Sequence, residues 1–266
     1  MNLVVMGSSA FVVPIFESLR HNHSIIEAYT REPKILGRKK VLTKTPVHEW
    51  AEQNHIKVRT DIHDFNGICV DYVVVASYGV IIPDDILAKA NFLNVHPSDL
   101  PKYRGPSPIR TAIRNGDSHS AVCITNMVHK VDAGDIYIKK GFDIGPDDTN
   151  DIIQAKVGKI ASLLLSRFLD NPTNYPPMPQ VGEVLMTKRT TLEDKVCDLS
   201  MPPNEIHNRV RAYGYVLMEL GGVQVKVLQT KIEDAKLKIL RVQPCGKKEM
   251  SWKDFCNGHR ELKSLQ

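Results

Sequence analysis

The sequence predicts an α/β fold in which a mostly parallel sheet is followed by a smaller C-terminal β-rich module. Apolar strand-like runs alternate with helical patterns up to about residue 115, which is typical of a parallel sheet with crossover helices. After a proline-rich segment, strand patterns follow one another with only short turns between them. The chain therefore reads as one large α/β part and one small β part.

The elements of the large part follow from hydrophobic periodicity. Asp71–Ala76 is an almost continuous β-branched run, the pattern of a strand buried on both faces. Pro46 suits the first turn of a helix. The expected strands are 3–6, 25–29, 71–76, 92–95, 122–127 and 136–140, and the expected helices are 11–19, 46–51, 84–90, 106–114 and 149–169.

The small part begins after the segment NPTNYPPMPQ (171–180), which is polar, proline-rich and typical of a semi-rigid linker. A helix is expected over 203–212, followed by strands 215–220, 223–230 and 236–242. The Gly221-Gly222 pair between the first two strands predicts a hairpin turn.

The bulk composition is that of an ordinary globular protein, with 42% hydrophobic and 24% charged residues. There is no apolar run long enough to span a bilayer, and the start MNLVVMGSSAF lacks the pattern of a secretory signal. Five scattered cysteines without a CxxC favour reduced thiols. We therefore expect a cytoplasmic protein without a membrane, a metal or an obligate protein partner.

The net charge of +5 is unevenly distributed. Residues 31–44 carry +5, residues 181–266 carry +4, and the remainder carries −4. Two basic surfaces would suit a polyanionic partner. A solvated loop and a lysine-rich surface explain the same numbers, and charge alone favours that simpler interpretation.

A group of polar residues that could take part in catalysis lies at the end of the predicted strand 92–95, in the stretch NVHPSDLPKYRG (94–105). Ligands bind outside the carboxyl ends of strands in open parallel sheets. Asn94 and His96 lie two apart on extended chain, so their side chains point the same way. An amide and an imidazole side by side suit a developing oxyanion. The alternative is that both satisfy backbone groups at a turn, which is commoner for an isolated Asn-x-His.

The stretch VDAGDI (131–136) adds two carboxylates near the same run of strands. If Asp132 reaches His96, it stabilises the imidazolium and fixes the ring orientation. Either Asp132 or Asp135 could instead be a turn residue that bonds its own backbone. Spacing alone does not separate these interpretations or choose between the aspartates.

Other common chemistries lack their motifs. The Ser8-Ser9 loop has neither G-x-G-x-x-G nor G-x-x-x-x-G-K-[ST], so a dinucleotide or NTP site is not indicated. Ser98 has no G-x-S-x-G context, which argues against a serine hydrolase. The histidines show no HExxH or similar spacing, so no metal is predicted.

These motifs together resemble the folate-dependent formyltransferases. The resemblance rests on residues 94–101 and 103–105, on Asp132-Ala133-Gly134-Asp135-Ile136, and on their order and separation. MGSSAFVVPIFESL, ASYGVIIP and REPKILGRKKVLTKTPVHEWA resemble the branch of the family that acts on methionyl-tRNA. The resemblance covers residues 1–170 well and the C-terminal part only in fragments.

The resemblance implies a Rossmann-like formyltransferase fold that carries a formyl group from 10-formyltetrahydrofolate to the amine of methionyl-tRNA. It implies that Asn94, His96 and Asp132 are catalytic, which selects Asp132 over Asp135. The residues implied to line the folate site are Ser98, Asp99, Leu100 and Pro101, with Tyr78, Gly79, Val80 and Ile81 against the pteridine.

The resemblance also gives the basic segments a role. Arg38, Lys39 and Lys40 match a family loop that approaches the acceptor end of tRNA, where they would neutralise phosphates. The implied organisation is a catalytic domain (1–170), a linker (171–181) and an OB-like, tRNA-binding barrel (182–266).

The sequence departs from the family pattern at a few positions. Asp99 stands where leucine is more usual, so we expect its carboxylate to be solvated or paired with Lys102 or Arg104. Lys39 replaces a usual glycine in the basic loop, and the C-terminal module is shorter than usual.

Two alternatives remain open from the sequence. A formyltransferase acting on an amino-sugar nucleotide or on glycinamide ribonucleotide shares the first domain, and the GRKK loop is the feature that argues against it. The other alternative is an inactive RNA-binding protein on the same scaffold. The retained Asn94, His96 and Asp132 argue against it.

Overall fold

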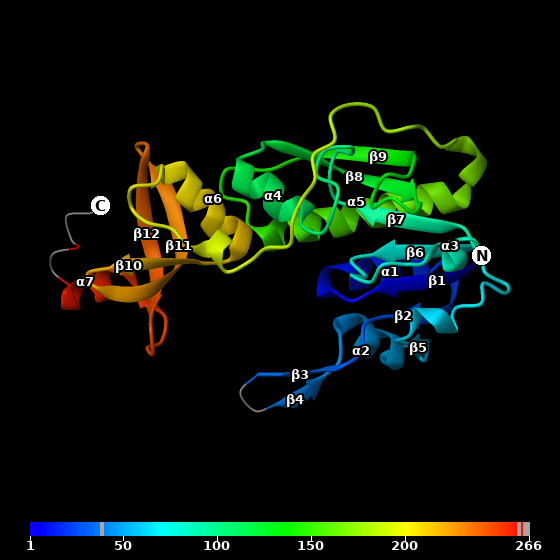
Figure 1. Cartoon of the computed structure of the whole chain (residues 1–266), viewed down its shortest axis with the longest axis horizontal. Coiled ribbons are helices and arrows are strands. Elements are labelled where there is room, and N and C mark those ends of the chain that lie inside the picture. The colour runs from blue at the N-terminus through cyan, green and yellow to red at the C-terminus, as the bar shows by residue number, and fades with distance from the viewer. Residues whose placement is uncertain (38–39, 260–261, 263–266) are drawn as a thin grey trace. The chain divides into compact units, whose positions relative to one another are not determined.

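The computed structural model describes residues 1–37, 40–259 and 262. A seven-stranded sheet in the order β5-β2-β1-β6-β7-β8-β9 forms the larger part of the chain (Figure 1). Its strands are β1 (Asn2–Gly7), β2 (Ser24–Tyr29), β5 (Lys57–Arg59), β6 (Tyr72–Ala76), β7 (Phe92–His96), β8 (His119–Asn126) and β9 (Ile136–Asp143). Pairs from β5 to β7 are parallel, whereas β7 and β8 are antiparallel. The prediction of a mostly parallel sheet is thus confirmed.

The central strands β1 and β6 are buried on both faces because they consist of apolar, largely branched residues. Val4 pairs with Val73 and Val5 with Val74 in the parallel register. All four side chains are almost fully inaccessible to solvent. Successive residues point to opposite faces, so each strand supplies both layers of the core.

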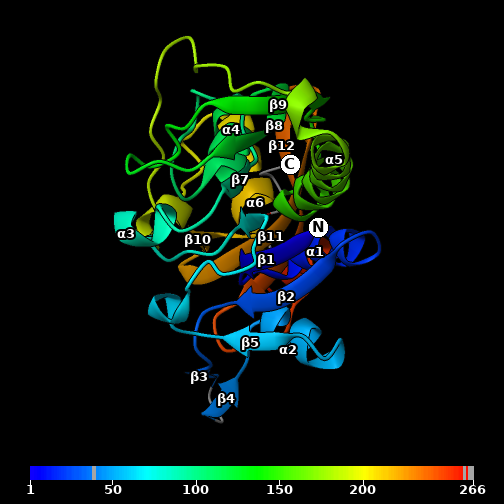
Figure 2. The same cartoon turned by 90° about the vertical axis from the view of Figure 1, so that its right-hand side faces the viewer.

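Helices cover both faces of this sheet. They are α1 (Val13–Arg20), α2 (Pro46–Gln53), α3 (Asp84–Leu87) and α5 (Asn150–Asp170), with short 3-10 turns η1 (Ala10–Val12), η2 (Ile62–Asp64) and η3 (Pro172–Asn174). In Figure 2, α1 and α5 lie on one side of the sheet and α3 on the other. Thr45 caps α2 by accepting a hydrogen bond from the backbone N–H of His48 at 3.1 Å, and Pro46 follows it at the first helical position.

A small antiparallel hairpin projects between β2 and α2. It consists of β3 (Lys34–Leu36) and β4 (Val41–Thr43). Ile35, Val41 and Leu42 expose more than half of their side chains. This hairpin contains the basic loop, and the sequence pattern did not predict its two short strands.

The C-terminal part forms a four-stranded antiparallel sheet in the order β10-β11-β12-β13. Its elements are η4 (Glu193–Lys195), α6 (Pro203–Tyr213), β10 (Val216–Leu220), β11 (Val223–Glu233), β12 (Lys236–Pro244), β13 (Met250–Ser251) and α7 (Trp252–Gly258). Gly221 and Gly222 both have positive φ, 58° and 72°, which confirms the predicted hairpin turn.

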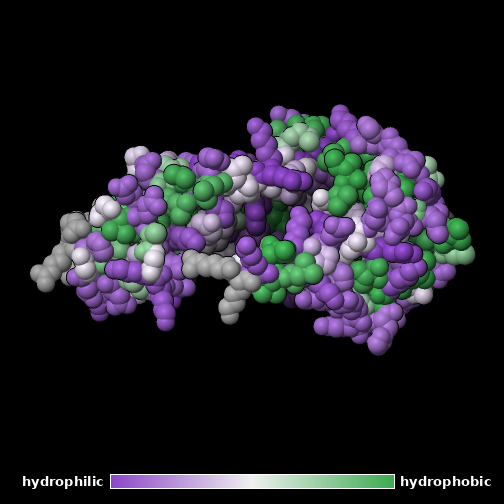
Figure 3. Space-filling model, turned by 60° about the horizontal axis from the view of Figure 1, so that its bottom comes forward, coloured by the Kyte–Doolittle hydropathy of each residue, from purple (hydrophilic) through white to green (hydrophobic). Residues whose placement is uncertain are grey.

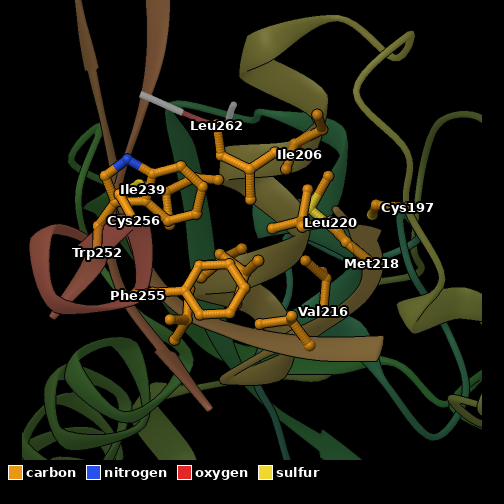
Figure 4. Packing of buried hydrophobic residues seen from close by; sticks show 14 residues of the cluster. Cys197, Ile206, Val216, Met218, Leu220, Ile239, Trp252, Phe255, Cys256 and Leu262 are labelled. Carbon is orange, nitrogen blue, oxygen red and sulfur yellow. The ribbon is translucent and has the colours of Figure 1, made fainter. Parts of the chain in front are cut away.

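This sheet has its own hydrophobic core. Figure 4 shows side chains from α6, α7 and the strands directed toward one another. The rings of Trp252 and Phe255 are 5.7 Å apart and belong to α7, which closes one end of the cluster. The core residues Val216, Val227 and Val242 are completely buried.

The chain divides into two compact units that are not continuous in sequence. The first unit contains residues 1–106, 121–142 and 154–186; the second contains 107–120, 143–153 and 187–266. Helix α4 (Pro108–Asn115) thus belongs with α6 and the C-terminal sheet. The division shows that the second unit recruits two segments from within the first 170 residues.

Arg211 of α6 joins these segments inside the second unit. It is 6% exposed, and its guanidinium donates to the backbone oxygens of Gly145, Asp148 and Ile113. His207 lies one turn earlier, with its Nε2 3.1 Å from the backbone oxygen of Pro146. Three backbone carbonyls from earlier in the chain therefore take the place of water around the buried Arg211 guanidinium.

The face drawn in Figure 3 mixes hydrophilic residues with small hydrophobic patches. Within the described part of the chain, no helix is both long and apolar enough to cross a membrane.

Candidate active site

The carboxyl ends of β1 and β6 meet at the point where the strand order reverses. β1 lies between β2 and β6, so chain connections leave it in opposite directions. The Ser8 N–H donates to the Ser77 oxygen at 3.1 Å, and the Ser8 hydroxyl donates to the Tyr78 oxygen at 3.1 Å. These bonds join the loops after the two strands. The reversal point is where open α/β sheets bind their ligands.

β7 ends at the same edge and carries the two candidate residues of the strand. Asn94 is half-buried and His96 is 4% exposed. The Asn94 amide donates to Oδ1 of Asp132 at 3.0 Å, and Nδ1 of His96 lies 3.5 Å from the same oxygen. The three side chains therefore meet at one carboxylate oxygen. Sequence spacing did not choose between Asp132 and Asp135; the carboxylate that contacts Asn94 and His96 is that of Asp132.

The second oxygen of Asp132 is also engaged. The backbone N–H of Gly105 donates to Oδ2 at 2.7 Å. Gly105 follows the loop that leaves β7, so the carboxylate links the strand end to this loop. Because both oxygens have donors, the acid is held in one orientation with its charge compensated.

The His96 ring is flanked by two acceptors. Its Nε2 lies 2.9 Å from the backbone oxygen of Tyr103, which can only accept, so Nε2 carries a proton. Nδ1 faces the Asp132 carboxylate. The ring is thus held between a backbone carbonyl and a carboxylate.

The loop after β7 contains the residues implied to line a folate site. Ser98 is fully buried, and its hydroxyl donates to the Lys102 oxygen at 2.6 Å. Leu100 and Pro101 are buried and joined by a cis peptide bond. Asp99 is exposed and forms an ion pair with Lys139 of β9 at 2.9 Å. Its carboxylate is solvated as expected, and it forms an ion pair with Lys139, a partner that the prediction did not include.

The loop after β6 divides into a buried and an exposed half. Tyr78 packs in the core, and burial raises the pKa of its phenol to about 12. Its hydroxyl has no hydrogen-bond partner among the residues that the structure describes. Gly79 has a φ of +76° and little around it, and Val80 and Ile81 are exposed, Ile81 by 84%. Residues 79–81 are therefore a part of this loop that is open to solvent.

The basic loop is only partly covered by the structure. Lys40 is exposed and has a left-handed φ of 49°. Its backbone N–H donates to the backbone oxygen of Gly37 at 3.1 Å, between β3 and β4. Arg38 and Lys39 lie outside the described residues. Among described residues, no group of three or more His, Cys, Asp or Glu side chains comes together in a way that could hold a metal ion.

Sequence reasoning missed the contact of Gln180 with the Asp132 turn and the contact of Arg104 with Gln180. Gln180 comes from the segment read as a linker, and Arg104 is 7% exposed beside it. Arg104 lies inside the recognised motif, but no local pattern connects Gln180 to a turn 48 residues earlier. Only the folded chain reveals this contact.

A model of the "Formyl transferase" family matches residues 1–169 of the chain. The chain belongs to the formyl transferase family. The matched residues include Asn94, His96 and Asp132 as well as both strand-end loops.

Relatives that match this chain along almost their whole length carry one name. The chain is 33% identical to the methionyl-tRNA formyltransferase of Ehrlichia canis, over 98% of each chain. It is 31% identical to that of Rickettsia bellii, over 98% of this chain and 97% of the relative. The similarity therefore extends through the C-terminal part.

Solved structures share the fold over more than nine-tenths of the chain. A methionyl-tRNA formyltransferase from Clostridium thermocellum matches with a TM-score of 0.66 and 17% identity, over 92% of this chain and 98% of that one. A sugar 3N-formyl transferase, studied in the presence of dTDP and 5-N-formyl-THF, matches with a TM-score of 0.71 and 18% identity, over 93% and 99%. Likeness of fold alone does not separate the two activities.

Proposed function

We propose that this formyltransferase moves the formyl group of 10-formyltetrahydrofolate to the α-amine of methionyl-tRNA, giving N-formylmethionyl-tRNA for translation initiation. The observation that carries the proposal is the meeting of Asn94 and His96 at one oxygen of Asp132. The full-length similarity to methionyl-tRNA formyltransferases supports the choice of acceptor.

The reaction is an acyl transfer. The amine nitrogen of the acceptor forms a bond to the formyl carbon, and the carbonyl electrons move onto its oxygen. The remaining N–H of the Asn94 amide, together with the positive charge of His96, stabilises this oxyanion. The amine proton passes to N10 of the folate as the C–N10 bond breaks, with Asp132 assisting the transfer through water. Tetrahydrofolate and the formylated amine leave.

Folate contacts are proposed for the two loops beside the three catalytic residues. Ser98, Asp99, Leu100 and Pro101 shape one wall, and Tyr78, Gly79, Val80 and Ile81 the other. The exposed apolar side chains of Val80 and Ile81 are suited to the flat face of a pteridine. The buried side chains of Ser98 and Tyr78 contribute by holding the loop backbones in place.

Recognition of tRNA is proposed for the basic loop and the C-terminal part. Arg38, Lys39 and Lys40 would neutralise phosphates of the acceptor arm. Residues 1–170 would carry the chemistry, 171–181 would link the two parts, and 182–266 would form an OB-like tRNA-binding module. The four-stranded antiparallel sheet supports an OB-like arrangement without specifying a closed barrel.

A second candidate acceptor is an amino-sugar nucleotide. The fold that the chain shares with a sugar 3N-formyl transferase, at a TM-score of 0.71, makes this acceptor the alternative to test. Relatives at 33% and 31% identity over almost the whole chain, however, are methionyl-tRNA formyltransferases. We therefore place the tRNA acceptor first.

The test compares both acceptors in one assay. Purified protein is incubated with 10-formyltetrahydrofolate and either methionyl-tRNA or a panel of amino-sugar nucleotides, and formylated product is measured by mass spectrometry. We expect product only with methionyl-tRNA. Product only with an amino sugar would reject the tRNA proposal, and uncharged tRNA serves as the control for dependence on the amine.

A further inference from the structure

Residues 178–186, hereafter the strap, run along the Asp132 turn inside the first unit. Met178 exchanges two backbone hydrogen bonds with Ile136, at 2.8 and 3.0 Å. Seven residues later, the backbone oxygen of Leu185 accepts from the Arg104 N–H at 2.9 Å. The strap is therefore fixed by backbone bonds on both sides of Gln180.

Gln180 uses its whole amide between these two anchors. Its Nε2 donates to the backbone oxygens of Asp132 at 2.9 Å and Gly134 at 2.6 Å. Its Oε1 accepts from Nε and Nη2 of Arg104, at 3.0 and 2.7 Å. Carbonyls only accept and a guanidinium only donates, so the partners allow one orientation of the amide.

The turn that Gln180 holds has an unfavourable backbone. Asp132 has a φ of +50°, in the left-handed region that a non-glycine residue adopts at a cost of about 1 kcal/mol or more. Gly134 is tightly enclosed, since a Cβ there would lie 2.0 Å from the Asn126 oxygen. Such a conformation persists only where surrounding contacts impose it. The two bonds from Gln180 are contacts of that kind.

We propose that Gln180 is a positioning residue for formyl transfer: it holds the backbone of the Asp132 turn so that the carboxylate meets Asn94 and His96. Asp132 reaches them from a loop, at 3.0 and 3.5 Å, and small displacements of the turn would separate them. Arg104 fixes the amide of Gln180. The inference rests on the proposed function and adds a residue outside the matched family segment 1–169.

Two substitutions separate this role from simple packing. Gln180→Ala removes all four hydrogen bonds. Gln180→Glu keeps an oxygen for Arg104 but has no N–H for the carbonyls of Asp132 and Gly134. If Gln180 served only to pair with Arg104, glutamate would restore activity. We expect kcat to fall by about tenfold or more in both variants, with KM for each substrate within about twofold of the wild type.

Thr173→Ala is the matched control. Thr173 lies in the same proline-rich segment, is exposed, and its hydroxyl donates only within the segment, to Asn171 at 2.8 Å. We expect wild-type kcat and KM. Activity of the wild type and this control on methionyl-tRNA shows that the proposed function holds; their inactivity would count against that function and not against Gln180.

A second readout does not require turnover. The Gly105 N–H donates to Oδ2 of Asp132, so amide hydrogen exchange at Gly105 reports the position of the carboxylate. We expect faster exchange at Gly105 in both Gln180 variants and no change in Thr173→Ala. Should Gln180→Ala fail to fold, as judged by circular dichroism, Gln180→Glu and the shorter Gln180→Asn supply the same two measurements. Wild-type kcat together with unchanged Gly105 exchange in a folded variant overturns the proposal.

Discussion

Asp132 receives three groups on its two oxygens. Asn94 and His96 share Oδ1, and the Gly105 N–H occupies Oδ2. An amide in place of the carboxylate would turn one acceptor into a donor that faces another donor. The negative charge beside the His96 ring would be lost as well.

We therefore expect Asp132→Asn to lower kcat by about 10²-fold or more, the range of general acid–base and charge effects. His96→Ala should also abolish turnover while the folate still binds, because the proposed role of the ring is at the reacting carbon and not in the loop walls. Steady-state kinetics and folate titration measure both. Asp135→Asn is the control, since Asp135 bonds Asn126 through its backbone oxygen and lies outside the three-residue contact. Equal losses in both aspartate variants would contradict the assignment.

The sequence predicts the side chains of the three-residue contact, but it does not predict the residues that hold the surrounding loops in place. Asn94 and His96 are two apart on a strand, so period-two geometry already places them on one face. The choice of Asp132 needed the family resemblance, because VDAGDI has two equivalent aspartates. Lys139 contacts Asp99, 40 residues earlier, and Gln180 contacts Asp132, 48 residues earlier. A single sequence carries no signal for such distant contacts.

At the scale of elements, α1 and α2 are joined by one carboxylate. Glu17 of α1 accepts from Arg20 at 2.7 Å and from the indole N–H of Trp50 in α2 at 2.9 Å. Arg20 first, and then Trp50, lower the pKa of Glu17 to about 2. A depressed folded-state pKa adds stability above the unfolded value of 4.5, and this contribution disappears as the pH falls toward 2.

We expect Glu17→Gln to reduce the free energy of unfolding by about 1 kcal/mol at pH 7, with the difference vanishing near pH 2. The loss of stability is small because a third of the Glu17 side chain is exposed and solvent screens the ion pair. Urea unfolding at several pH values measures it. Glu49→Gln, an exposed site in the first turn of α2, should change stability by only a few tenths of a kcal/mol. A pH-independent difference would show that charge is not the cause.

Element prediction succeeded where burial imposes a pattern. The β-branched run of β6 and the periodic face of α1 follow directly from core packing. β3, β4 and β5 are three residues each, too short for any period to be recognised. Helix α7 has a local sequence signal that hydrophobic periodicity does not capture. Ser251 caps it by accepting a hydrogen bond from the Asp254 N–H at 3.1 Å, in a Ser-x-x-Asp arrangement.

At the scale of the whole molecule, the compact units do not follow the order of the chain. The second unit takes 107–120 and 143–153 from within the sequence of the α/β part. A linear sequence reading places boundaries at linkers, where composition changes. The contacts that α4 and residues 143–153 make cannot be recognised from composition. A prediction from the sequence therefore assigns both segments to the α/β part.

Arg211 makes this division testable. Its buried guanidinium relies on the oxygens of Ile113, Gly145 and Asp148, none of which belongs to 182–266. A fragment of residues 182–266 would keep the buried cation and lose these acceptors. We expect it to lack a cooperative thermal transition by circular dichroism. In the full chain, Arg211→Met should leave those carbonyls unpaired and lower the stability of the second unit by about 2–4 kcal/mol.

Arg241→Met provides the matched control, because Arg241 is 49% exposed and pairs with Glu249 at the surface. It should change stability by about 1 kcal/mol or less. A fragment of 182–266 that unfolds cooperatively, with the midpoint of the second unit in the full chain, would show that the C-terminal sheet and α6 are self-sufficient. Failure of the fragment together with a large Arg211 effect would show that the tRNA-binding module proposed here folds only with segments supplied by the first 153 residues.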